Sequence, residues 1–140
     1  WQVLGAKLAV HLWVGGIPAL LCGVAVAAAL RLPFPTAVMT VILQLLFTLL
    51  QACFGLFVNL LHPNLTWVSE MTPIKQSLGV LFSLLGGWGY AALLGIGGYF
   101  LTVPVPAWVA LLALNLLTAL LSLLLLRWLK GRGARIFATL

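Results

Sequence analysis

The amino-acid sequence predicts an all-α fold, a polytopic integral membrane bundle of about four transmembrane helices. Of the 140 residues, 64% are hydrophobic and only 6% are charged, and the mean hydropathy is +1.25. A soluble domain carries roughly 25% charged residues, which it needs to face water. A soluble chain this short would expose large apolar patches and aggregate. We therefore expect most of the surface to face membrane lipid.

Four apolar runs are long enough to cross a bilayer core, which requires about 20 residues per helix. Two short segments with two prolines each, residues 31–35 and 102–106, end these helices and form tight turns. We expect one transmembrane domain over residues 1–140, and a start at Trp1 rather than Met indicates a piece of a longer chain. The expected spans are residues 8–30, 36–61, 74–101 and 107–129.

Lysine and arginine gather on one side of this predicted topology. The N-terminus, the loop at residues 62–73 and the C-terminus share a side with six of the seven cations, and the other side holds only Arg31. Loops rich in Lys and Arg stay in the cytoplasm, so we expect both termini there. Cations between and beyond apolar runs form no basic face for nucleic acid, and we expect no such partner. The six cations are Lys7, Lys75, Arg127, Lys130, Arg132 and Arg135.

Small residues recur at every fourth position of the first and third spans. In lipid no hydrophobic force drives helices together, so association relies on close backbone approach at small side chains. These stripes predict two tightly packed seams, which meet each other or helices outside this piece; a hinge role in transport is the alternative. They comprise Gly15, Ala19, Gly23 and Ala27 in the first span, and Gly79, Ser83, Gly87, Ala91 and Gly95 in the third.

Uncharged polar residues line one face of the second span and one face of the fourth, at steps of three and four. Such groups usually form hydrogen bonds between membrane helices; a hydrated transport pathway is the alternative. Because no ionisable residue joins either stripe, we favour hydrogen bonding between helices. The two stripes are Thr40, Gln44, Thr48, Gln51, Gly55 and Asn59, and Asn115, Thr118 and Ser122.

The sequence lacks the residue patterns of known catalytic sites. Glu70 is its one acid, and His11 and His62 lie far apart, so paired carboxylates, a Ser-His-Asp triad and an HExxH metal motif are excluded. The glycine runs of the third span lack the Lys-Ser/Thr that a phosphate-binding loop requires. We expect no enzyme, no metal site and no cofactor bound by this chain, and another polypeptide must bind any ATP.

The loop between the second and third spans differs from the rest of the chain. It holds the one acid and a tryptophan outside any span, and it runs into a basic helix start. A carboxylate near a helix start complements the helix dipole, but the tryptophan has no such structural role. We therefore expect these residues to couple the chain to a cytoplasmic partner; the alternative is that the tryptophan anchors the loop at the inner membrane interface. The coupling residues are Trp67, Glu70, Lys75 and Gln76.

Two segments of the chain resemble a known family. The loop reads Pro63-Asn-Leu-Thr-Trp67-x-x-Glu70-x-x-x-Ile74-Lys75-Gln76-Ser77. The basic C-terminal tail closes on Gly133-x-x-x-Phe137-x-x-Leu140. Both patterns resemble those of bacterial ABC-2-type exporter permeases, in which the first joins two late transmembrane helices and the second ends the chain.

This resemblance implies the C-terminal transmembrane portion of a larger permease subunit, located in the bacterial plasma (inner) membrane. It further implies ATP-driven export with a separate cytoplasmic ATPase subunit. The remaining partners would be other transmembrane helices of the same permease or a second permease copy. Two alternatives stay open: a self-contained small membrane channel or carrier, and a structural subunit of a membrane complex.

Overall fold

The computed structural model describes residues 2–61 and 78–139, and these residues are almost entirely helical. Within them, four helices are long and apolar enough to cross a membrane, which confirms the predicted all-α class and makes the chain a multi-pass membrane protein. The helical segments are α1 (Gln2–Ala29), α2 (Phe34–Leu61), α4 (Leu78–Thr102), α5 (Ala107–Trp128), the π-helix η1 (Leu129–Gly133) and α6 (Ala134–Thr139).

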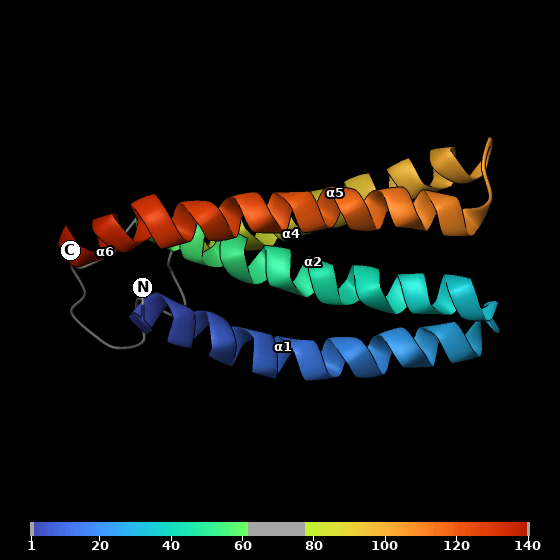
Figure 1. Cartoon of the computed structure of the whole chain (residues 1–140), viewed down its shortest axis with the longest axis horizontal. Helices are drawn as coiled ribbons and strands as arrows, with labels where there is room; N and C mark the ends of the chain where they lie inside the picture. The colour runs from blue at the N-terminus through green and yellow to red at the C-terminus, as the bar shows by residue number, and fades with distance from the viewer. Residues whose placement is uncertain (1, 62–77, 140) are drawn as a thin grey trace.

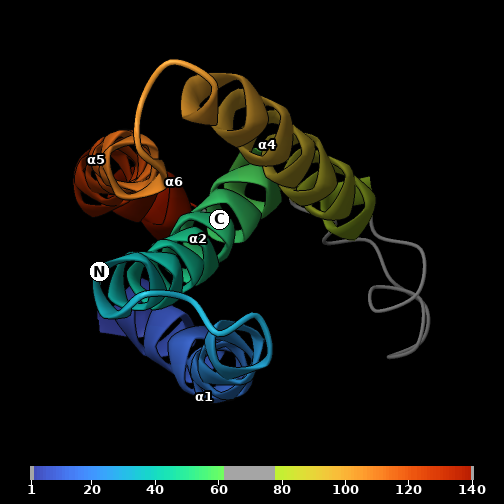
Figure 2. The ribbon, with the colours of Figure 1, turned by 90° about the vertical axis from the view of Figure 1, so that its right-hand side faces the viewer.

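Helix α2 lies at the centre of the bundle. It packs against α1, α4 and α5, and the end-on view of Figure 2 shows these three helices arranged around it. Successive long helices run in opposite directions, so both ends of the described chain lie at the same end of the bundle (Figure 1). We call this the terminal end; the α1–α2 and α4–α5 turns lie at the opposite end (Figure 1).

The helix boundaries differ from the predicted spans by a few residues. α1 begins at Gln2, six residues before the predicted span, and continues the apolar run through residues 3–6 to the N-terminal side of Lys7. α2 begins at Phe34, two residues early, and includes Pro35 in its first turn, where a missing N–H costs nothing. The residues predicted to open the third span, 74–77, lie outside the described residues.

The fourth helix does not end at residue 129 as predicted. It continues through the π-helical turn η1 into α6, so one helical rod runs from Ala107 to Thr139. In the π turn the N–H of Ala134 donates to the carbonyl oxygen of Leu129, five residues earlier. π turns are rare and insert an extra residue into the helical register. The apolar run ends near Trp128, but the backbone continues because its hydrogen bonds are satisfied within the helix.

Arg31 ends α1 in a left-handed conformation, with φ at 48°. The N–H of Arg31 donates to Ala28 O and that of Leu32 to Ala27 O, both at 3.1 Å, which is a Schellman motif. Glycine is the usual residue at this position, and a side chain there costs about 1–2 kcal/mol. Pro33 follows and cannot extend the helix. The tight turn predicted between the first two spans is therefore present.

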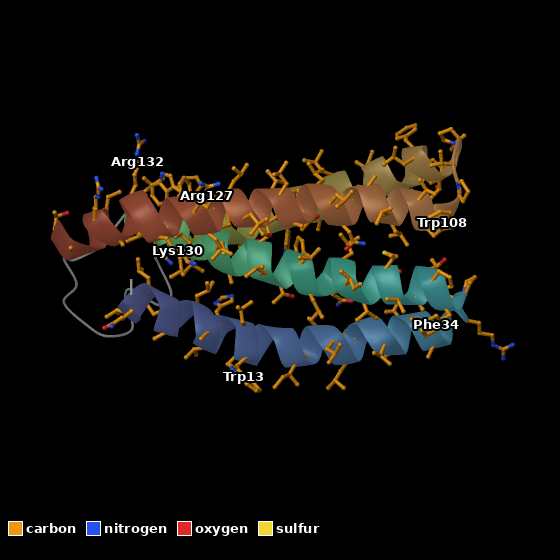
Figure 3. The ribbon with its side chains drawn as sticks, viewed as in Figure 1. Trp13, Phe34, Trp108, Arg127, Lys130 and Arg132 are labelled. Carbon is orange, nitrogen blue, oxygen red and sulfur yellow. The ribbon has the colours of Figure 1, made fainter. Side chains whose placement is uncertain are left out.

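The buried core is small and lies toward the terminal end. Here the first turns of α1, the second half of α2 and the π turn meet. Elsewhere large apolar side chains are exposed; Trp13 of α1, for example, is 71% exposed and points away from the bundle in Figure 3. This distribution is that of a protein whose surface faces lipid. The core residues are Leu4, Leu8, Ala52, Cys53, Leu60 and Leu129.

The small residues of α1 lie where α1 crosses α2. A Cβ added to Gly15 would lie 3.3 Å from Thr48 Cγ2, and one added to Gly23 would lie 3.0 Å from Gln44 Oε1. Gly23 is buried and its Cβ position is only 3.5 Å from the Cα of Val41, so the two backbones approach closely there. The first glycine stripe therefore packs against the polar stripe of α2.

The small residues of α4 divide between a helix crossing and an open face. Gly79 and Gly87 are buried, and a Cβ on Gly87 would lie 2.6 Å from Gln51 Oε1 of α2. Gly95 is exposed, and a Cβ there would meet no atom within 4 Å, so this glycine is not part of a seam among the described helices. A seam with a helix outside this piece stays a prediction. The reason is that α4 crosses α2 at an angle and touches it over only part of its length (Figure 2).

Candidate functional site

The threonines of the α2 stripe bond within their own helix. Thr40 Oγ1 donates to Thr36 O at 2.8 Å, and Thr48 Oγ1 donates to Gln44 O at 2.9 Å. These bonds satisfy each hydroxyl without a partner helix, as is common for Ser and Thr in membrane helices. The two threonines are therefore compact, satisfied groups, and Thr48 faces Gly15 of α1.

Gln51 connects α2 to α4. Its Nε2 donates to Ser83 O at 2.8 Å, and Ser83 Oγ lies 3.4 Å from the same nitrogen. The absence of a side chain at Gly87 provides the space that the amide occupies. This is the interhelical hydrogen bonding expected for a polar group in lipid.

The polar face of α5 is buried against its neighbours. Asn115 Nδ2 donates to Met39 O of α2 at 3.1 Å, and the hydroxyls of Thr118 and Tyr90 of α4 lie 2.8 Å apart. Ser122 Oγ donates to Thr118 O at 2.8 Å. Asn115, Thr118 and Ser122 are 6%, 0% and 1% exposed, so this stripe joins α5 to α2 and α4 and does not line an open path. Asn115 Oδ1 is buried without a hydrogen-bond partner in the structure.

A polar cavity of about 330 Å³ lies between α1, α2 and α4, toward the terminal end. Lys7 and His11, one turn apart on α1, line one wall. Gln51 and Asn59 of α2 and Ser83 of α4 line the rest, together with apolar side chains and Gly55. Five hydrogen-bonding side chains from three helices thus line one cavity. We call this the polar cavity.

Sequence reasoning found only part of the polar cavity. It predicted Gln51 and Asn59 as members of the α2 stripe, but it assigned Ser83 to a packing seam. It used His11 to exclude a metal motif, and it treated Lys7 as an orientation signal. The four-residue spacing of Lys7 and His11 places both on one face of α1, and this was the available signal. Only the packing of α1 against α2 shows which helix that face meets.

The polar cavity is rich in hydrogen-bond donors. An ammonium, two carboxamides, a hydroxyl and an imidazole can donate protons, and the lining residues that the structure describes include no carboxylate. This set of hydrogen-bond donors suits a ligand with a polar or anionic group rather than a metal cation. Within residues 2–61 and 78–139, no three His, Cys, Asp or Glu side chains lie close enough to hold a metal ion.

The predicted coupling residues Trp67, Glu70, Lys75 and Gln76 lie outside the described residues. The described helices that flank them end at Leu61 and begin at Leu78. Both flanking positions are at the terminal end of the bundle (Figure 1).

The described cations follow the predicted asymmetry. Arg127, Lys130 and Arg132 lie together at the terminal end in Figure 3, whereas Phe34 and Trp108 lie at the opposite end. Among the described residues, Arg31 is the cation that lies in a turn at that opposite end. The shared side of the predicted topology is therefore present, and its cytoplasmic location remains a prediction.

We compared the chain with protein-family models, with curated proteins and with solved structures, and none of them matches it.

Proposed function

We propose that this chain is the transmembrane part of a bacterial permease, one that exports its substrate with energy from a separate cytoplasmic ATPase of the ABC type. The observation that carries the proposal is the polar cavity. Lys7 and His11 are ionisable and exposed residues that line this cavity, and they belong to the terminal-end half of a helix long and apolar enough to span the bilayer. Ionisable groups inside membrane bundles are costly and mark substrate or ion paths.

The position of the polar cavity supports coupling to a cytoplasmic motor. Its lining residues Lys7, Asn59 and Val80 belong to the turns of α1, α2 and α4 nearest the terminal end. The same end carries the excess of cations that predicts a cytoplasmic side. A movement of the segment 62–77 would act directly on α2 and α4, the two helices that it connects. The segment 62–77 resembles one in exporter permeases, and this resemblance supports the same partner, a cytoplasmic ATPase.

A role as a structural subunit is the second candidate, and one observation favours it. Ala91 and Gly95 lie one turn apart on α4 and are exposed, and the space around Gly95 is open. Small residues at such a spacing allow another transmembrane helix to approach closely. This face suits further helices of the same permease equally well.

The test is purification of the full polypeptide from its native membrane in a mild detergent. We expect an ATPase to co-purify and to hydrolyse ATP. Because this sequence carries no phosphate-binding loop, the hydrolysis would come from that partner. Substitution of both Trp67→Ala and Glu70→Ala should remove the ATPase and leave the protein folded and inserted. The matched control is Trp108→Ala, which removes an exposed tryptophan at the opposite end.

Two results would contradict the proposal. If the double variant retains the ATPase as well as the wild type does, the segment 62–77 is not the coupling surface. If no hydrolysis accompanies the purified wild type, but the protein alone conducts ions or solutes across liposomes, it is a channel or carrier that needs no motor. Absence of both activities would favour the structural subunit.

A further inference from the structure

A second, apolar groove of about 630 Å³ lies between α2, α4 and α5. Gln51 lines both this groove and the polar cavity, so its side chain forms part of the wall between them. The groove exists because α4 and α5 meet near their connecting turn and separate toward the terminal end (Figure 2). Gly86 and Gly89 of α4 line it without side chains that would fill it, and a Cβ on Gly89 would meet no atom within 4 Å.

Aromatic rings form the wall of the groove nearest the terminal end. Phe57 of α2 and Trp128 of α5 meet edge to face, with ring centroids 4.8 Å apart, and Phe54 stacks beside Phe57 at 6.3 Å. Leucines of α5 and Tyr90 of α4 line other parts of the groove. This lining matches an acyl chain, which gains dispersion contacts from flat, rigid surfaces.

Cations lie directly beyond the aromatic wall. Arg127 precedes Trp128 in the chain, and the π turn that follows carries Lys130 and Arg132. All three are exposed at this end of the helix, and Figure 3 shows Lys130 on the opposite side of the helix from Arg132. The groove residues of α2 and α5 belong to the halves of these helices nearest that end. The apolar groove and the cations therefore occupy the same leaflet.

We propose that this groove binds one anionic phospholipid. An acyl chain lies between α4 and α5 on the floor made by α2, and the phosphate group lies beside Arg127 and Arg132. The charge complementarity decides the occupant, because basic groups beside an interhelical groove select anionic head groups. The exposed cations at one end of the groove would not strengthen the binding of a second copy of the chain or of an apolar helix.

The experiment measures lipid binding to the detergent-purified protein with phosphatidylglycerol and phosphatidylcholine as probes. Native mass spectrometry reports the number of lipids retained, and the melting temperature is followed as each lipid is titrated. We expect one phosphatidylglycerol to be retained and to raise the melting temperature saturably. Phosphatidylcholine should bind at least about tenfold more weakly, because it carries no net charge for the cations to attract.

Two kinds of variant separate the chain site from the head-group site. Gly89→Leu places a side chain in the groove and should abolish binding of both lipids, whereas Gly95→Leu, on the same helix at another open position, should leave binding unchanged. Arg127→Gln combined with Arg132→Gln should lower phosphatidylglycerol affinity roughly thirtyfold, toward that of phosphatidylcholine. Arg31→Gln, at the opposite end, is the matched control.

Equal binding of both lipids by the wild type would overturn the proposal, and so would unchanged binding by Gly89→Leu. If Gly89→Leu instead converts a dimer to a monomer in size-exclusion chromatography and leaves lipid retention intact, a second copy occupies the groove. If Gly89→Leu is not folded, Trp128→Ala provides the alternative variant, since it removes one ring of the aromatic wall and leaves the backbone crossings of α4 untouched. Unchanged lipid retention by that variant would equally reject the site.

Discussion

Substitution of Gly87 by alanine tests how α4 is held against α2. The added Cβ would lie 2.6 Å from Oε1 and 2.7 Å from Nε2 of Gln51, so the amide must move. That movement breaks the 2.8 Å hydrogen bond from Gln51 to Ser83 O. A hydrogen bond between membrane helices contributes about 0.6–2 kcal/mol. Because the displaced atoms end a flexible side chain, we expect a cost of about 1 kcal/mol and a retained fold.

The control for this substitution is Gly95→Ala on the same helix. Alanine is favoured over glycine in a helix by up to about 1 kcal/mol in water, and this term is shared by both variants. Since a Cβ on Gly95 would meet no atom within 4 Å, that variant should be as stable as the wild type or more stable. The difference between the two variants isolates the contact with Gln51.

A double-mutant cycle completes the test. In a Gln51→Ala background the space beside Gly87 is empty and the bond to Ser83 is already lost, so Gly87→Ala should no longer destabilise the protein. The assay is the free energy of unfolding in mixed micelles, measured by titration with a denaturing detergent. A coupling energy near 1 kcal/mol is expected between the two positions. A coupling energy below about 0.3 kcal/mol would refute the reasoning, because independent sites give additive changes.

Two further predictions concern membrane orientation and the polar cavity. In a background without native cysteines, a single cysteine at Val105 should react with an impermeant reagent in intact cells, whereas one at Thr66 should not; the reverse pattern would place the termini outside. Ser83→Cys should react with a water-soluble thiol reagent at least about tenfold faster than Ser122→Cys, because Ser83 lines the polar cavity and Ser122 is 1% exposed. Similar rates would mean that the cavity is not hydrated.

The membrane character of the chain and its helices could be predicted from sequence because hydrophobicity is summed along each segment. A helix satisfies its backbone hydrogen bonds internally, so an apolar run of sufficient length is helical in lipid whatever its neighbours are. For this reason the spans were predicted to within a few residues at most ends. The exceptions are the start at Gln2, where the helix continues on the N-terminal side of Lys7, and the extension through the π turn, where polar residues continue the helix beyond the apolar run.

The candidate site was only partly predictable, as Gln51 and Lys7 illustrate. Spacing placed Gln51 on the polar face of α2, but its partner Ser83 depends on where α4 crosses α2. Lys7 was assigned to the membrane orientation because it is a cation at the edge of an apolar run. Its place in the polar cavity depends on the side of α1 that packs against α2.

The sequence by itself determined that the described residues form membrane-spanning helices, and it determined the number of these helices. It also determined which residues of each helix share a face. Tertiary structure alone decided which faces meet. In water, burial distinguishes the apolar face of a helix from its polar face, but in lipid nearly every face of these helices is equally apolar. Contacts are then selected by shape and hydrogen bonding at the crossings, so Gly87 meets Gln51 and Gly95, two turns further along the same stripe, meets no other helix.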